Sequence, residues 1–262
     1  MDELELTEFQ RTIADFVEHA GLPGRHCARS AISHIQSAWK IRSIDPEMCV
    51  FRSLTAVEES TGAIFHSLKR HRYQGADKLR LRSHVHKAAL RPFLAAIETN
   101  LAQSKLNHFS LALEARGNGK NGRVLLRFSV PNAPEGMGFG YPEPPLHFAL
   151  ARNGAKYYFT EELKSIISTH NAASVLEHVK DLANQRNRLL YASQEGVPKV
   201  AELTDDFLLK KRDVVFQHLC IYLMIDPYPQ RQLFVQQALE SFLKMLDLLP
   251  DDSSLEKENA AE

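Results

Sequence analysis

Residues 109–130 read FSLALEARGNGKNGRVLLRFSV, and this stretch decides what kind of fold the chain adopts. In both halves of it every second residue is apolar: Phe109, Leu111, Leu113 and Ala115 in the first, then Val124, Leu126, Phe128 and Val130 in the second. A period of two is typical of half-buried β-strands. The segment GNGKNG at 117–122 supplies the turn between them. The stretch therefore predicts a β-hairpin.

A second and weaker alternation follows this hairpin on either side of Asn153-Gly154. Its apolar members are Leu146, Phe148, Leu150, Tyr157 and Phe159. Together the two patterns predict a small antiparallel sheet of three or four strands within residues 108–159. The chain on both sides has helical periodicity, so we expect a mainly α fold: a helical bundle with a small inserted antiparallel β-sheet.

Four helices are expected before the sheet, because apolar residues recur there at spacings of three and four. They cover residues 4–20, 25–42, 46–73 and 76–104. Asp45-Pro46 marks the start of the third, since Asp caps helices and proline suits the first helical position. Pro92 falls inside the fourth, where we expect a kink or a break.

Helical periodicity returns after the sheet. It predicts helices over 161–168, 172–193, 205–225 and 230–249, followed by a disordered acidic tail. We divide the chain accordingly into an N-terminal helical pair (1–45), the first half of the bundle (46–107), the inserted hairpins (108–159), the second half of the bundle (160–249) and the tail (250–262).

Composition excludes several classes of protein. Among 262 residues, 32 are Lys or Arg and 32 are Asp or Glu, so there is no overall basic balance. The longest apolar run, 219–225, is far below the roughly 18 residues that span a bilayer. The acidic start MDELELTEFQ does not look like a secretory signal, and the three cysteines are too scattered for a disulfide framework. We expect a cytoplasmic protein with no membrane partner.

Metal and nucleotide sites find little support in the sequence. No histidine has another histidine four residues away or a glutamate three residues before it, which are the spacings that place ligands on one helix face. Residues 117–122 match G-x-G-x-x-G, but the expected strand after them rules out the helix that a dinucleotide site requires. We therefore predict no cofactor. Cys49 and Cys220 lie in apolar helical surroundings and are predicted to be inert core thiols.

The neutral total conceals a basic middle. Residues 69–91 carry eight basic residues against one acid, Asp77. This segment is either a phosphate-binding surface or a pair of solvated helix faces that contact the acidic ends of the chain. The candidate RNA-binding residues are Arg70, Arg72, Arg80, Arg82, His84, His86 and Lys87.

A second signal is a charge in line with an apolar seam. On the helix expected at 172–193, Arg186 shares a stripe with valines and leucines, and Asn187 lies beside it. An arginine that faces a bundle interior needs an anion, since an unpaired buried charge is costly. We expect Arg186 to pair with Glu58 or Glu59 of the third helix. The pair is either a structural ion pair or part of a phosphate pocket.

These residues carry a resemblance to a known family. The segment LANQRNRLLYA at 182–192 resembles the last core helix of HEPN-superfamily domains, which are helical bundles, often dimeric. The segment AVEESTGA at 56–63, with His84-Val85-His86-Lys87 after it, is similar to the abortive-infection AbiV-like branch, which implies antiviral defence. Ribonucleases of the family carry Arg, commonly a polar residue such as Asn, and then His four to six residues later.

This sequence departs from that pattern. The positions four to six residues beyond Arg186 hold no histidine, and Tyr191 occupies the nearest slot. Tyrosine titrates near 10 and is a poor base at neutral pH. Either Tyr191 is a tuned substitute, or His84 or His86 folds into the site, or the domain binds RNA or protein without cutting.

The resemblance leads to a functional expectation with alternatives. We expect an RNA-associated HEPN-like protein, a defence or stress ribonuclease with a degenerate motif; any enzyme would be a metal-independent endoribonuclease. Its catalytic candidates are Arg186, Asn187, Tyr191, Glu58 and Glu59. The alternatives are a non-catalytic interaction module that binds a protein partner through the inserted sheet, and a small-ligand-binding helical protein. RNA and a second copy of the chain are the other expected partners.

Overall fold

The computed structural model describes residues 3–103, 110–129, 138–169, 179, 184, 189, 199–200 and 203–247. The chain forms two compact units, each assembled from separate stretches of sequence. Unit 1 takes residues 1–71, 113–125 and 184–229, and unit 2 takes 72–112, 126–183 and 230–262. The described residues contain seven α-helices and two small sheets. The expected mainly α fold with a small antiparallel sheet is confirmed.

Unit 1 is built on four helices: α1 (Glu8–His19), α2 (Gly24–Ile41), α3 (Pro46–Arg70) and α7 (Asp205–Ile225). Side-chain caps explain three of their starts. Thr7 and Gln10 form a reciprocal capping box at α1, Asp45 accepts from the Met48 N–H at α3, and Thr204 accepts from the Phe207 N–H at α7. These caps satisfy backbone donors that the first turn leaves unpaired.

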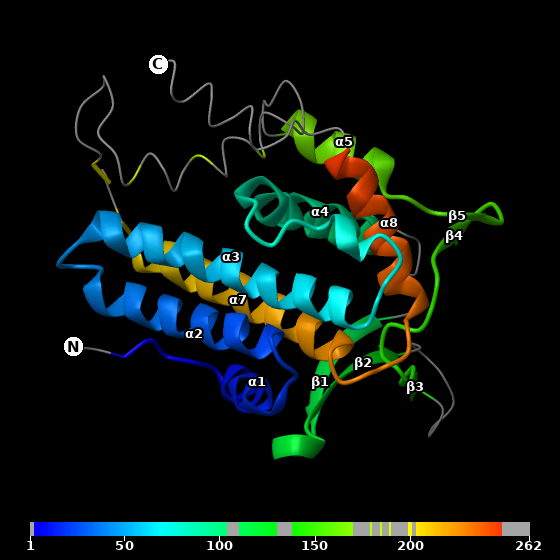
Figure 1. Ribbon diagram of the computed structural model, residues 1–262, viewed down its shortest axis with the longest axis horizontal. Helices are drawn as coiled ribbons and strands as arrows, with labels where there is room; N and C mark the ends of the chain where they lie inside the picture. The colour runs from blue at the N-terminus through cyan, green and yellow to red at the C-terminus, as the bar shows by residue number, and fades with distance from the viewer. Residues whose placement is uncertain are drawn as a thin grey trace. The chain divides into compact units, whose positions relative to one another are not determined.

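Small residues let the helices of unit 1 approach closely. In Figure 1, α2, α3 and α7 lie side by side, and they contact one another along their lengths. The residues at these contacts are fully buried and mostly small: Ala28, Ala31 and Ala38 on α2, and Ser53, Ala56, Ser60 and Ala63 on α3. Larger apolar side chains come from α7, where Val215, Leu219 and Leu223 are buried. The core of unit 1 therefore lies between α7 and the small-residue faces of α2 and α3.

Unit 2 contains α4 (His84–Gln103), α5 (Thr160–Thr169) and α8 (Leu233–Leu246), with a short 3-10 turn, η1 (Ala76–Lys78). Its core is aromatic. The Phe93 ring lies 5.3 Å from that of Phe242 and 6.1 Å from that of Phe159 between centroids. Phe159 is fully buried at a φ of 55°, a conformation that strains a non-glycine residue and persists where packing holds it.

The strands form two separate sheets rather than one. The first contains β1 (Ser110–Arg116), β2 (Arg123–Ser129) and β3 (Phe139–Gly140) in that order. The second pairs β4 (Ala151–Arg152) with β5 (Ala155–Lys156) across Asn153-Gly154. Both predicted turns are therefore present. The apolar run Leu146, Phe148 and Leu150, expected as a strand, precedes β4 without joining a sheet.

The fourth helix begins later than predicted. Helical periodicity placed its start at residue 76, but α4 starts at His84 and only η1 lies between. Two local features explain the correction. Gly75 adopts a left-handed φ of 84° that interrupts the helical path, and the Ser83 hydroxyl accepts from the His86 N–H in the manner of a helix cap. The helix then runs through Pro92 without the break that we considered.

The structure confirms three further predicted helices and describes only single residues of a fourth. The predictions for α2 and α7 match the structure within a residue, and α5 covers the helix expected at 161–168. Of the helix expected at 172–193, only Val179, Asn184 and Leu189 lie among the described residues, and all three are helical. The acidic tail at 250–262 lies outside the described residues.

Candidate functional site

The structure describes two of the five predicted catalytic residues, Glu58 and Glu59. Arg186, Asn187 and Tyr191 lie outside the described residues, so their pairing with α3 stays a prediction. Glu58 and Glu59 are half-buried on α3, in the middle of its length. Both belong to unit 1.

A buried hydroxyl–imidazole contact lies next to this glutamate pair. The Ser60 hydroxyl is 3.0 Å from Nδ1 of His218 on α7, and the Thr61 hydroxyl is 3.4 Å from the same atom. All three side chains are fully buried. A serine beside a histidine can serve as a nucleophile and base, but that chemistry needs access for a substrate. Complete burial makes this contact a polar link between α3 and α7 instead.

Sequence reasoning did not identify this contact. Its only signal was a histidine inside the apolar part of α7, where a polar side chain must find a partner. The partner on α3 could not be found without knowing how the two helices pack.

Arg70, one of the predicted RNA-binding residues, neutralises a buried acid of its own unit. Its guanidinium lies 2.9 Å from the carboxylate of Asp226, which is 4 % exposed at the end of α7. The other carboxylate oxygen of Asp226 accepts from the Gly21 N–H at 2.7 Å, and His71 Nε2 lies 2.9 Å from its main-chain oxygen. Asp226 therefore ties the end of α3 to the turn between α1 and α2.

The other predicted RNA-binding residues all belong to unit 2, in the segment that leads into α4. Arg72, Arg80 and Arg82 are exposed, as is Lys78. Three further candidates occupy the first turn of α4 and are half-buried: His84, His86 and Lys87. We call residues 72–91 the basic segment.

Two hydrogen bonds fold the basic segment back on itself. The Arg80 N–H donates to Nδ1 of His86 at 3.2 Å, and the His86 N–H donates to the Ser83 hydroxyl at 3.0 Å. The His86 ring thus accepts a main-chain hydrogen bond within the turn. Arg80 and Arg82, which belong to the same turn, are exposed.

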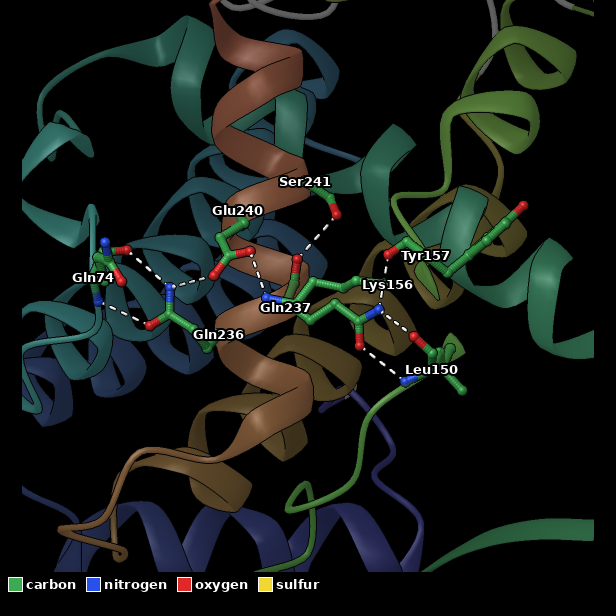
Figure 2. A network of polar contacts seen from close by, with 8 residues as sticks. All are labelled: Gln74, Leu150, Lys156, Tyr157, Gln236, Gln237, Glu240 and Ser241. Atoms are coloured by element: carbon green, nitrogen blue, oxygen red, sulfur yellow. Dashed lines mark hydrogen bonds and ion pairs between the residues drawn. The ribbon is translucent and has the colours of Figure 1, made fainter. Parts of the chain in front are cut away.

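A glutamine on α8 anchors the start of the basic segment. Oε1 of Gln236 accepts from the Gln74 N–H at 2.9 Å, and Nε2 of Gln236 donates back to the Gln74 carbonyl at 3.1 Å. Figure 2 shows this reciprocal pair on one side of α8. An amide side chain that pairs in both directions imitates a neighbouring strand. It fixes the chain immediately after Arg72 and Tyr73.

Gln237, the next residue of α8, anchors the chain on either side of the β4–β5 hairpin in the same way. Oε1 of Gln237 accepts from the Leu150 N–H at 2.9 Å, while its Nε2 donates to the carbonyls of Leu150 and Tyr157 at 2.7 and 2.8 Å. Gln237 is 1 % exposed. Figure 2 shows how this one amide closes the base of the β4–β5 hairpin.

Glu240, one turn further along α8, lies between these two contacts. It receives Nζ of Lys156 at 2.9 Å and Nε2 of Gln236 at 3.3 Å. The side-chain hydrogen bond to Glu240 is the largest cause of the raised pKa of Lys156. The start of the basic segment and the β4–β5 hairpin are therefore both held on α8.

A nearly buried carboxylate lies beside the same hairpin. Glu162 accepts the Tyr157 hydroxyl at 2.5 and 2.7 Å on its two oxygens, and the Asn100 amide at 2.9 Å. Burial alone would raise the pKa of Glu162. The hydrogen bonds from Tyr157, Asn100 and its own main chain, with the nearby charge of Arg152, outweigh burial and lower it.

The pKa of Tyr157 is raised. Burial is the largest cause, and the hydrogen bond to Glu162 is the next. Tyr157 stays a neutral hydroxyl donor and is not activated as a nucleophile or base. The arrangement holds α4, α5 and the β4–β5 hairpin together. The pKa of Tyr157 is moved up and that of Glu162 down, so both move away from neutral pH and neither is suited to acid–base catalysis there.

Other classes of site find no support in the described part of the chain. There, no three His, Cys, Asp or Glu residues gather in a way that could hold a metal ion. None of the helices described combines the length and apolar character needed to cross a membrane.

Comparison with known proteins gives no relative to reason from: no family model, no curated protein and no solved structure matches this chain.

Proposed function

We propose that this protein binds RNA through the basic segment, residues 72–91. The observation that carries the proposal is its charge: six basic residues stand against one acid, Asp77. Arg72, Lys78, Arg80 and Arg82 present that charge at the surface of unit 2. Phosphate contacts by such side chains supply most of the affinity of nucleic-acid binding that does not depend on sequence.

The anchoring of the segment adds to this proposal. Side chains on a fixed backbone lose less conformational freedom when they bind, so their charges act together. Gln236 fixes the chain at Gln74, and His86 fixes it at Arg80. The exposed arginines Arg72 and Arg82 lie immediately beyond these two fixed points.

We further propose that the RNA is cut, weakly, at a HEPN-like site in unit 1. Arg186 and Asn187 would hold the phosphate, Glu58 or Glu59 would orient Arg186, and Tyr191 would line the site. The half-buried glutamates on α3 support this assignment. As in the family that the sequence resembles, the cleavage would proceed without metal: the ribose 2′-oxygen attacks the neighbouring phosphorus while Tyr191, in place of the missing histidine, takes the 2′-hydroxyl proton and returns it to the leaving 5′-oxygen.

Fluorescence anisotropy with a labelled single-stranded RNA tests the binding proposal. The double variant Arg72→Gln and Arg82→Gln should bind more weakly than the native protein at every salt concentration. The slope of log K against log salt should fall by about 0.7 for each lost phosphate contact. The matched control is Lys40→Gln with Lys210→Gln, which removes two exposed charges elsewhere. Equal losses in both pairs would contradict a defined site.

Cleavage is tested separately, with total RNA and a chelator present. Native protein should produce fragments that Arg186→Ala does not produce. Fragments that persist unchanged in this variant would rule out the proposed catalytic site and leave the binding proposal intact.

The second candidate function is a non-catalytic interaction module that uses the inserted sheet. Three of its large apolar side chains are exposed: Leu111, Leu113 and Phe139. Light scattering over a concentration series tests for a second copy as the partner. This candidate is favoured if assembly depends on Leu111 and Leu113 while RNA does not bind.

A further inference from the structure

The third strand of the first sheet presents one aromatic ring to solvent. Phe139 on β3 is 59 % exposed, although phenylalanine usually contributes to a core. Gly138 and Gly140 flank it in sequence and, by the alternation of a strand, belong to the opposite face of the sheet from Phe139. Tyr141 meets the ring in a T-shaped contact with centroids 5.7 Å apart. Tyr141 therefore contacts one edge of a ring that is otherwise largely exposed.

The strand register explains why this ring points outward. Phe128 on β2 packs against Phe148, whose ring stacks on that of Phe234 at 4.8 Å between centroids. This chain of rings directs Phe128 into unit 2. Ser129, the next residue, points to the opposite face, and it is the partner of Phe139 in the β2–β3 ladder. Phe139 must then lie on the outer face of the sheet.

The charge of this sheet favours an anionic partner. β2 carries Arg123 and Arg127 and no acid, β3 carries no charge, and on β1 the single acid, Glu114, pairs with Arg116 at 3.0 Å, which leaves the sheet with two further arginines. By the period of two, the half-buried Arg127 lies on the same face as Ser129 and Phe139. An aromatic ring with arginine on one face of a sheet is the combination that takes an unpaired base and its phosphate.

We propose that Phe139 is a stacking platform for an unpaired base of single-stranded RNA. The proposal rests on the RNA binding proposed above and adds a substrate class, since a base within a duplex is already stacked and cannot reach the ring. The basic segment would supply affinity for phosphate, and Phe139 would supply the preference for single strands. The exposed part of the Phe139 ring is the surface on which the base would stack.

Two variants and two nucleic acids test the proposal by fluorescence anisotropy. Phe139→Leu should weaken binding of a labelled 12-nucleotide single-stranded RNA by about 5- to 150-fold, the range of base–aromatic stacking. Phe139→Trp should retain the native affinity. A 12-base-pair RNA duplex should bind native protein and Phe139→Leu equally. Leu233→Ala is the matched control, because Leu233 is an exposed apolar residue of the same unit at 52 % exposure.

The results separate this proposal from the one on which it rests. Native binding that is sensitive to Arg72 and Arg82 but unaffected by Phe139→Leu would overturn the stacking platform alone. Equal losses on single strands and duplex would overturn it too, as would a loss of self-association at unchanged RNA affinity. Absence of any RNA binding by native protein would overturn both. Because Phe139 is exposed, an unchanged melting temperature should confirm that the variants fold.

Discussion

The side-chain amide of Gln237 hydrogen-bonds in both directions with the main chain of Leu150, and the same amide also reaches the carbonyl of Tyr157. A buried side chain on α8 thus takes the place that another strand would occupy at the base of the β4–β5 hairpin.

Gln237→Ala should destabilise the protein by about 1–3 kcal/mol, because buried main-chain groups lose their partner. Gln236→Ala is the matched control. Gln236 makes a similar pair with Gln74, but that pair is exposed and water can replace it. Its effect should stay below about 1 kcal/mol. Urea denaturation measures both values, and equal effects would contradict the role given to burial.

Asp226 should matter more than the arginine that pairs with it. Asp226→Ala removes a buried carboxylate that serves both Arg70 and the Gly21 N–H, so we expect a loss of about 2–4 kcal/mol. Arg70→Ala should cost less, because Asp226 keeps the Gly21 N–H as a partner and water can replace the Arg70 guanidinium, whose side chain is 43 % exposed. Urea denaturation of the two single variants decides the order; a larger effect of Arg70→Ala would contradict it.

Glu162 should make stability depend on pH in the acid range. Its pKa in the folded protein is lowered from the ordinary value of 4.5. The stabilisation is therefore present above pH 4.5 and is lost as the pH falls through the lowered pKa. Glu162→Gln should cost about 1–3 kcal/mol at pH 7 and progressively less on acidification.

The neighbour Glu161 provides the control for this experiment, because its side chain is 71 % exposed. Glu161→Gln should change stability little at any pH. The free energy of unfolding is measured between pH 3 and pH 7 for the native protein, Glu162→Gln and Glu161→Gln. If the native protein and Glu162→Gln lost stability in parallel on acidification, the role given to Glu162 would be wrong.

The three cysteines should differ in reactivity. Burial raises the pKa of Cys49 to about 11 and that of Cys220 to about 12, so almost no thiolate forms at pH 8. Cys27 is half-buried on α2. A thiol reagent should modify Cys27 alone in native protein and all three cysteines in urea. Cys27→Ser should then remain unmodified under native conditions; rapid labelling of that variant would show that α3 or α7 opens.

The sequence was informative where local chemistry decides structure. Asp45 and Thr204 act as the caps that their positions suggest, and the glycine-rich turn at 117–122 joins two paired strands. Prediction failed at residues 76–83. There a left-handed Gly75 and the Ser83 cap override a helical pattern that is apolar at the right spacing.

The candidate sites were less predictable for a physical reason. The charge of the basic segment is visible in the sequence, but the engagement of Arg70 depends on Asp226, 156 residues away. Phe139 lies in a stretch rich in proline and glycine, outside the two alternating patterns from which strands were predicted. Only the β2–β3 register shows which face it occupies. Contacts of this kind are set by packing between distant segments, which no spacing in the sequence encodes.

The division into two units has a consequence for biosynthesis. The chain passes from one unit to the other five times, at 71/72, 112/113, 125/126, 183/184 and 229/230. Helices α1 to α3 leave the ribosome long before α7, which buries their shared face. Unit 1 cannot close around its core until α7 has been made, and unit 2 cannot do so until α8 has been made. No uninterrupted stretch of the sequence encodes either unit, so a stop codon before residue 205 would remove α7 from unit 1 and α8 from unit 2 together.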